Sequence, residues 1–247
     1  MRASVVWLIC FYLSTGGCSG DSSSQSTGIS GSTSRFAIHK NNLLILDGDK
    51  LDVFSLEDPL QPLETATITL DRDSPETIFA TEGHFFIAAS DGLSVFSIDD
   101  VGAVNKVSEV NHFTARDPVF VVGNYAYVTL RSPNEFGINQ FQIYDFTDIT
   151  QGILLNSYEM TFPWGLAVTA TTAFVCDGSN GLQALNVSAP DNIQPLYNLI
   201  DDTCFDVLLG GAGLISTGSN GINQYVINAN GSLSLVSEIL VEPAVKE

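Results

Sequence analysis

Leu93-Ser-Val-Phe-Ser-Ile98 is the clearest of five copies of one strand pattern that decides the fold of this 247-residue chain. The other four copies are Leu51-Asp-Val-Phe-Ser-Leu56, Phe141-Gln-Ile-Tyr-Asp-Phe146, Leu182-Gln-Ala-Leu-Asn-Val187 and Ile222-Asn-Gln-Tyr-Val-Ile227. The five copies begin at positions 51, 93, 141, 182 and 222, which lie 42, 48, 41 and 40 residues apart. A period of about 40 residues built from short strands is typical of the blades of a β-propeller.

The second repeat shows how one blade is built. Glu76–Thr81 and His84–Ala89 are short runs rich in apolar residues, and Glu82-Gly83 forms the turn between them. Leu93–Ile98 follows as a third strand and Val104–Val110 as a fourth. The sequence therefore predicts an all-β, five-bladed β-propeller of four-stranded antiparallel blades. The expected propeller covers residues 35–241, with blades at about 35–73, 74–114, 115–161, 162–201 and 202–241.

The first strand of each repeat is nearly continuous in apolar character. This predicts an inner strand that is buried on both faces near the axis of the propeller. Every repeat contains its four strands without an exchange between the two ends of the chain. Closure of the ring would then depend on packing between the last and first blades alone, or the ring stays open.

Charge and composition restrict the classes of function. The chain carries 28 Asp and Glu against 9 Lys and Arg, a formal net charge of −19, and 45% of its residues are apolar. Nucleic-acid binding needs Lys and Arg to displace counterions from phosphates, so this class is excluded, and anionic lipid headgroups attract such a chain poorly. The acidity favours a soluble monomer, with cation binding and adaptation to salt as alternatives.

The amino terminus has the order of an export signal. Met1-Arg2 supplies a positive charge, Ala3–Leu13 is apolar, and small residues lead up to Cys18. The apolar run is shorter than the roughly 20 residues that a helix needs to span a bilayer. Residues 1–17 resemble a bacterial lipoprotein signal, and this resemblance implies lipidation of Cys18. Ordinary cleavage and an uncleaved segment are the alternatives.

A polar tether separates this signal from the repeats. Residues 18–34 are rich in Ser and Gly and contain one large apolar residue, Ile29, so they should form a flexible linker. Residues 242–247 form a short C-terminal tail. The lipoprotein resemblance further implies membrane contact through the lipid anchor alone. By the same analogy, Ser19 in place of Asp after the lipidated position implies the outer membrane or the cell surface.

The fourth repeat carries the features of a known repeat family. Gly181–Pro195 combines Gly-Leu, an apolar strand, Asn, Val, Ser and two prolines, and Leu51–Pro62 has a similar layout. This pattern resembles the LVIVD repeat of bacterial and archaeal cell-surface proteins. The resemblance extends over essentially all of residues 35–241 and implies a β-propeller at the cell surface. It implies no assigned activity, and no functional residue can be carried over.

Three turns offer carboxylates at one position of the blade. Asp47, Asp91 and Asp177 each precede Gly after a second strand, and Asp49 adds a fourth carboxylate. A ring of such oxygen ligands on one face could hold Ca²⁺. Turn chemistry is the stronger interpretation, because Asp-Gly is favoured in tight turns and Asp can cap its own backbone.

Residues that enter the inner strands should share that same face near the axis. The candidate binding face consists of Arg116, Asp117, Arg131, Trp164 and Asp202, with Phe162 as a near neighbour. A mixture of Arg, aromatic and acidic side chains suits a binding funnel. Packing between blades is the alternative role for Trp164, and a local ion pair is the alternative for Arg116 and Asp117.

Two cysteines should lie at one end of neighbouring blades. Cys176 ends a second strand, and Cys204 starts the next inner strand. Outside the cytoplasm the two can form a disulfide, provided that their Cα atoms come within about 4.4–6.8 Å. Two buried free thiols are the alternative.

The sequence carries no mark of a catalytic site. It has neither a Gly-x-Ser-x-Gly elbow nor a phosphate-binding Gly-rich loop, and its three His residues are scattered. It predicts a non-catalytic propeller, tethered at the surface, that binds a protein or glycan of the envelope without a cofactor. A hydrolase or metal-dependent enzyme with an acidic central pit is one alternative, and a purely structural envelope component is the other.

Overall fold

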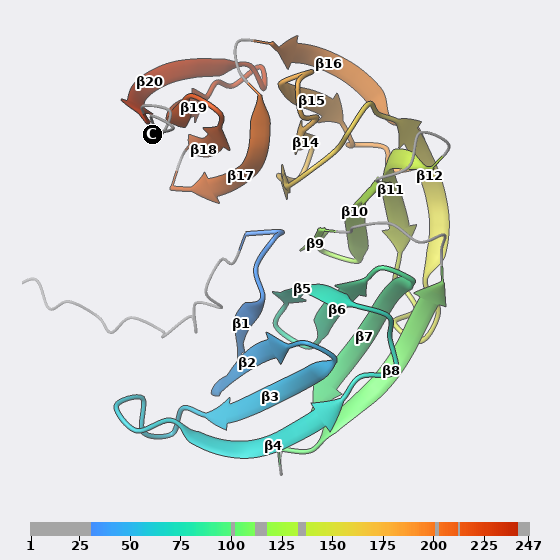
Figure 1. The fold of residues 1–247 in the computed structure, drawn as a ribbon. Helices are drawn as coiled ribbons and strands as arrows, with labels where there is room; N and C mark the ends of the chain where they lie inside the picture. Colours follow the sequence, from blue (N-terminus) through green and yellow to red (C-terminus); the bar gives the residue numbers. More distant parts are fainter. Residues whose placement is uncertain are drawn as a thin grey trace, which may run out of the picture.

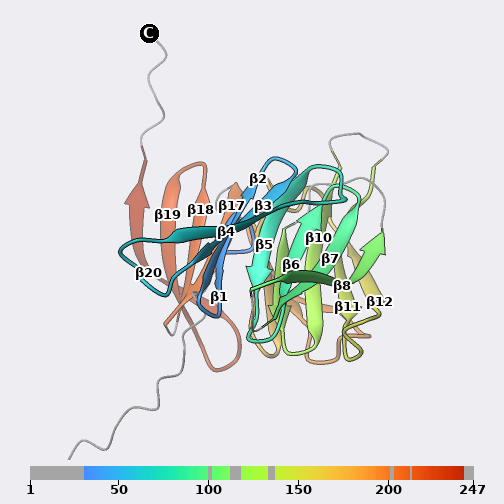
Figure 2. The same ribbon diagram turned by 90° about the horizontal axis from the view of Figure 1, so that it is seen from below.

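The computed structural model describes residues 31–99, 102–111, 118–132, 137–200, 203–211 and 213–241. These residues form five four-stranded antiparallel sheets, which confirms the predicted five-bladed β-propeller. Figure 1 shows the sheets side by side around a common centre, with the first strand of each sheet innermost. Figure 2, turned by 90°, shows most strands running between the same two faces of the molecule.

The twenty strands of the described residues follow the chain order blade by blade. Blade 1 contains β1 (Phe36–His39), β2 (Asn42–Asp47), β3 (Lys50–Ser55) and β4 (Leu63–Thr69). Blade 2 contains β5 (Pro75–Ala80), β6 (Phe85–Ala89), β7 (Gly92–Ile98) and β8 (Val104–Asn111). Blade 3 contains β9 (Val119–Val122), β10 (Tyr125–Arg131), β11 (Asn139–Asp145) and β12 (Ile153–Glu159). Blade 4 contains β13 (Leu166–Val168), β14 (Thr172–Cys176), β15 (Leu182–Asn186) and β16 (Gln194–Leu199). Blade 5 contains β17 (Cys204–Gly210), β18 (Gly213–Gly218), β19 (Gly221–Ile227) and β20 (Leu233–Leu240).

Neighbouring blades pack through their inner strands in chain order. β1 contacts β5, β5 contacts β9, β9 contacts β13, and β13 contacts β17. One apolar cluster joins blades 2 to 5, and a second joins blades 1 and 2. Fully buried rings such as Phe85, Phe141 and Phe174 each contribute about 1.5–3 kcal/mol relative to exposure. The described part of the ring is thus held as four successive blade interfaces.

The fifth interface, between blades 5 and 1, is not formed by apolar packing. Neither apolar cluster of the described residues includes side chains from both blades. Figure 1 shows the two sheets set apart across an opening. The predicted burial of inner strands on both faces holds for β13, but it is wrong for β1, whose residues alternate between exposed and buried. β1 has a neighbouring blade on one side only, which explains its half-exposed pattern.

Residues 31–34 lie at the centre of the ring, which we call the hub, between the inner strands of blades 2, 4 and 5. They do not form the end of a flexible linker. The Ser32 hydroxyl accepts a hydrogen bond from Leu166 N (2.8 Å) in blade 4, and Ser32 is buried. Thr33 donates to the Asp206 carboxylate (2.7 Å) in blade 5, and Ser34 O accepts from Ile78 N (2.8 Å) in blade 2. The predicted boundary of the tether at residue 34 is therefore wrong. The side chains of Ser32 and Thr33 find partners on β13 and β17, and the backbone carbonyl of Ser34 finds one on β5.

Candidate functional site

An arginine and three aromatic rings gather where blades 3, 4 and 5 meet. Arg131 ends β10, and its guanidinium carbon lies 3.3 Å from the centroid of the Trp164 ring and 5.2 Å from that of Phe162. The Trp164 ring meets Phe162 and Phe205 edge-on, at centroid distances of 5.8 and 5.5 Å. Cation–π contacts of this kind contribute about 0.5–2 kcal/mol, more where water is excluded. We call these four residues the Arg–aromatic cluster.

Backbone hydrogen bonds of Trp164 hold the Arg–aromatic cluster in position. Trp164 N donates to Cys176 O (2.7 Å), and Trp164 O accepts from the Thr129 hydroxyl (2.6 Å) of β10. Arg131 is buried, whereas Phe162 and Phe205 remain 38% and 37% exposed. The cluster therefore presents two aromatic rings to solvent on a rigid base that contains a permanent positive charge.

A disulfide supports this base. Cys176 at the end of β14 is bonded to Cys204 at the start of β17, with Cα atoms 4.9 Å apart. It is one of the two states that the sequence left open for these cysteines. The bond links blade 4 to blade 5 beside Trp164, since Trp164 hydrogen-bonds the Cys176 carbonyl.

Asp177 orders the segment that carries Phe162. Its buried carboxylate accepts from Phe162 N (2.6 Å) and Thr161 N (3.0 Å), and from the side-chain amides of Gln183 (2.7 Å) and Asn180 (3.2 Å). A carboxylate has about four acceptor positions, and these donors use them. Asp177 is consequently a positioning residue for the cluster, with no oxygen facing an open site.

The four turn carboxylates are not brought together. Asp91 pairs with Arg72 (3.4 Å), Asp177 is enclosed in blade 4, and Asp47 is exposed on blade 1 with Asp49 beside it. Within the described ranges, no three His, Cys, Asp or Glu side chains are grouped so that they could hold a metal ion. The predicted ring of calcium ligands is therefore not formed by these residues, because the four carboxylates are distributed over blades 1, 2 and 4, and Asp91 and Asp177 each bind groups of their own surroundings.

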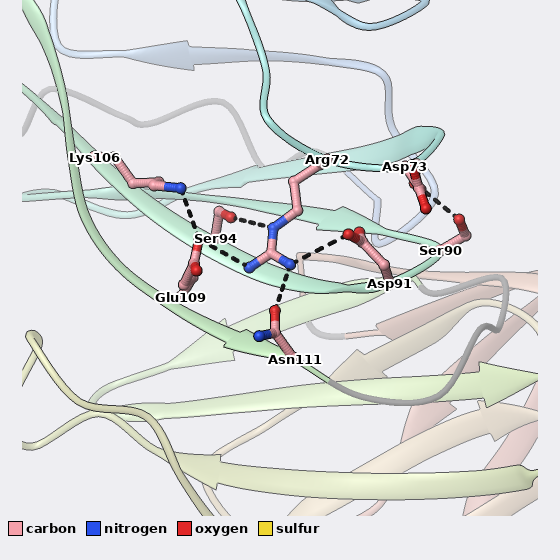
Figure 3. Close-up of polar contacts among 8 residues, drawn as sticks. All are labelled: Arg72, Asp73, Ser90, Asp91, Ser94, Lys106, Glu109 and Asn111. Carbon is pink, nitrogen blue, oxygen red and sulfur yellow. Dashed lines mark hydrogen bonds and ion pairs between the residues drawn. The ribbon is translucent and has the colours of Figure 1, made fainter.

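Arg72 organises a second polar network, which Figure 3 shows in the outer part of blade 2. Its side chain is 4% exposed and contacts Asp91 (3.4 Å), Glu109 (3.3 Å), Ser94 (2.8 Å) and Asn111 (2.7 Å). A hydrogen bond from Lys106 lowers the pKa of Glu109, and the positive charge of Arg72 lowers it further. The network fastens the link between blades 1 and 2 to three strand positions, which is a structural role. No motif in the sequence marks Arg72, although it is one of only 9 Lys and Arg residues.

Asp206 is a partly buried carboxylate near the axis of the ring that no sequence motif marks. Burial raises the pKa of Asp206, while hydrogen bonds from Thr33 and Val207 act in the opposite direction. A Cβ at position 165 would overlap this carboxylate, so Gly165 is required for the close approach of blades 4 and 5. A β-bulge between Cys204 and Asp206 sets the direction of this side chain.

Several predicted site residues cannot be placed. Cys18, Arg116, Asp117 and Asp202 lie outside the described residues. Of the candidate binding face, the structure places Arg131 and Trp164, and it brings them into contact with each other and with Phe162. In the parts of the chain that the structure describes, no helix has the length and apolar character of a membrane span.

Comparisons with known proteins agree on the fold and give nothing finer. No protein-family profile and no curated protein matches the sequence, so the resemblance to LVIVD repeats stays a prediction. A functionally unknown protein from Desulfotomaculum acetoxidans is 15% identical, with a TM-score of 0.67, over 85% of this chain and 71% of that protein. The periplasmic gluconolactonase of Pseudomonas aeruginosa is 14% identical, with a TM-score of 0.61, over 82% of this chain and 70% of the enzyme. BamB from Moraxella catarrhalis is 10% identical, with a TM-score of 0.58, over 76% of this chain and 56% of BamB. Likeness at these identities supports a β-propeller fold and leaves activity undetermined.

Proposed function

We propose that this chain is an exported, non-catalytic β-propeller that binds an envelope protein through the Arg–aromatic cluster. Arg and Trp are the residue types that most often dominate the binding energy of protein interfaces, and they do so where they are rigid and surrounded by other contacts. Phe162 and Phe205 offer exposed rings on a base fixed by a disulfide and a buried carboxylate. This prearranged cluster is the single observation that carries the proposal.

A protein partner is favoured over a glycan by the state of the Trp164 ring. Sugars stack on an open aromatic face, and here Arg131 lies over one face of the indole at 3.3 Å. The buried arginine instead makes the centre of the surface attractive to an acidic or carbonyl-rich loop. Binding of a protein partner in this way requires no cofactor. We further propose that lipidated Cys18 holds the domain at the outer membrane.

The test compares two matched pairs of substitutions in a pull-down from envelope extracts. Phe162→Ser with Phe205→Ser removes the exposed rings, while Leu154→Ser with Leu196→Ser removes exposed apolar side chains from the outer strands of blades 3 and 4. We expect the first pair to weaken the captured protein's binding about 30-fold or more, which corresponds to about 2 kcal/mol. Equal binding by both pairs of variants would refute the role of the cluster. Capture of a glycan without any protein would refute the proposal of a protein partner.

A hydrolase has one observation in its favour, namely the raised pKa of Asp206 in the hub. A carboxyl group with a raised pKa is suited to donate a proton. The likeness to a gluconolactonase makes lactones the natural first substrates. Lactone hydrolysis that disappears in Asp206→Asn would establish this second role, and absence of hydrolysis by the wild-type chain would remove it. A purely structural role would follow if the wild-type chain captured no partner and hydrolysed no substrate.

A further inference from the structure

Blade 1 presents an apolar sheet face that nothing in the described structure covers. Phe36 and Ile38 of β1 point away from blade 2, because the alternate residues Ala37 and His39 are buried against it. Phe36 is 59% exposed. The cross-strand partners of this face continue the apolar surface outward, with Phe36 opposite Ile45 and Ile38 opposite Leu43 and, one strand further, Phe54.

Blade 5 presents a second uncovered face, which is mixed, since Gln224 lies between Ile222 and Val226 on it. Ile222 of β19 pairs with Ile239 of β20, which is 61% exposed, and Val226 lies further along the same side of β19. The alternate side of this sheet, with Val207 and Leu214, belongs to the apolar core shared with blade 4. The two bare faces are those that border the opening between blades 5 and 1 in Figure 1.

At the four interfaces between successive blades, a sheet face of this kind is covered by the neighbouring sheet. At each of them an inner strand and its sheet pack against the next sheet, from β1 on β5 to β13 on β17. Residues 31–34 reach only the hub end of the opening, where they contact β13, β17 and β5. The sheet faces further from the axis therefore lack the neighbour that every internal blade face has.

We propose that the opening receives a β-sheet wedge from a second, different polypeptide, which completes the ring. The size of the wedge follows from the comparisons, since this chain covers 71% of the Desulfotomaculum acetoxidans protein and 70% of the gluconolactonase. The unmatched remainder of those chains is enough for one or two further blades at about 40 residues each. Such a wedge would be apolar toward Phe36 and Ile38 of blade 1, and it would combine apolar and polar residues toward Ile222, Gln224 and Val226 of blade 5.

Charge determines which partner fits. The bare face of blade 1 also carries Asp47, Asp52 and Glu64 against the single cation Lys50, by the register of β2, β3 and β4. A second copy of this chain, with its net charge of −19, would add to the repulsion. The chain's own residues 19–30 hold a single large apolar residue. The partner is accordingly a different chain with Lys or Arg at the rim of its sheet.

Photo-crosslinking from both faces tests this proposal in the full-length chain. Phe36 or Val226 is replaced by p-benzoylphenylalanine, and the same replacement at Leu154 on β12 serves as the exposed apolar control. We expect both faces, but not the control, to give a crosslinked product of one and the same mass in the cells that make the protein. Peptides from that product should alternate apolar residues and contain flanking Lys or Arg. A second irradiation is carried out in cell lysates brought to 1 M NaCl, where the Debye length is about 3 Å. The yield of the crosslinked product should fall there, because salt screens the attraction between the acidic face and the basic partner.

Four outcomes would overturn the wedge. A product of twice the chain mass that contains only peptides of this protein would show a second copy in the opening. A crosslink between blades 1 and 5 of one chain would show that the ring closes on itself, and a crosslink to residues 3–13 would show that the signal region fills it. Lack of a protein product from either face would show that the faces stay bare.

Discussion

The disulfide between Cys176 and Cys204 gives the sharpest prediction of stability. The bond closes a loop with a sequence separation of 28 residues between β14 and β17. Closing such a loop removes about 12 cal/mol/K of entropy from the unfolded chain, or about 3.6 kcal/mol at 25 °C. The replacement of both cysteines by Ala should therefore lower the free energy of unfolding by about that amount. For a domain of this size the melting temperature should fall by about 7–14 °C.

Urea unfolding followed by circular dichroism provides the assay. Oxidised wild type, wild type with reducing agent, and the Cys176→Ala/Cys204→Ala variant are compared under identical conditions. The last two should coincide, with midpoints about 1–2 M below that of the oxidised protein. Reduction without any shift of the midpoint would refute the reasoning, as would free thiols at Cys176 and Cys204 in the unreduced protein. Since Trp164 binds the Cys176 carbonyl, reduction should also shift its fluorescence.

Three further perturbations are predicted. Arg72→Met should cost about 2–3 kcal/mol by leaving charged partners unpaired, whereas Lys106→Met in the exposed part of the same network should cost about 0.5 kcal/mol, as measured by urea unfolding; equal effects would contradict the network. Asp177→Asn should increase amide hydrogen exchange at Phe162, because the new amide group replaces one acceptor with a donor; unchanged exchange would show that the carboxylate does not hold this segment. Burial raises the pKa of Asp206, so its contribution to stability is fully present below the unfolded pKa of about 3.8 and is lost as pH rises through the folded pKa. The stability of Asp206→Asn relative to wild type should therefore increase with pH from about 3.5 upward, and a pH-independent difference between the two would refute the shift.

The repeat was sufficient to predict the blades because each blade is a local unit. The expected strand Glu76–Thr81 corresponds to β5 at Pro75–Ala80, a difference of one residue. Closure of the ring could not be predicted in the same way, because it depends on the angles between whole sheets. The half-exposed pattern of β1 could not be predicted from its residues, because the exposed Phe36 and Ile38 are more apolar than the buried Ala37 and His39.

The site was partly predictable for the same reason. Arg131 and Trp164 occupy equivalent ends of neighbouring blades, and the structure joins them. The positions of Phe205 and Asp206 were not predicted, because a β-bulge after Cys204 places an extra residue on β17. The bulge reverses which face of the sheet the following side chains point to. The turn carboxylates gave a false grouping, since equivalence among blades places residues on a common ring without placing them near one another.

The path of residues 31–34 has a mechanical consequence. Tension transmitted along the preceding chain enters the domain at its axis, where Ser32, Thr33 and Ser34 are fastened to three separate sheets. The load is thereby shared among interior strands, and none of it falls first on an outer edge that could be peeled away. A tethered domain that is pulled by flow would therefore resist mechanical unfolding best when the tether is attached at this point.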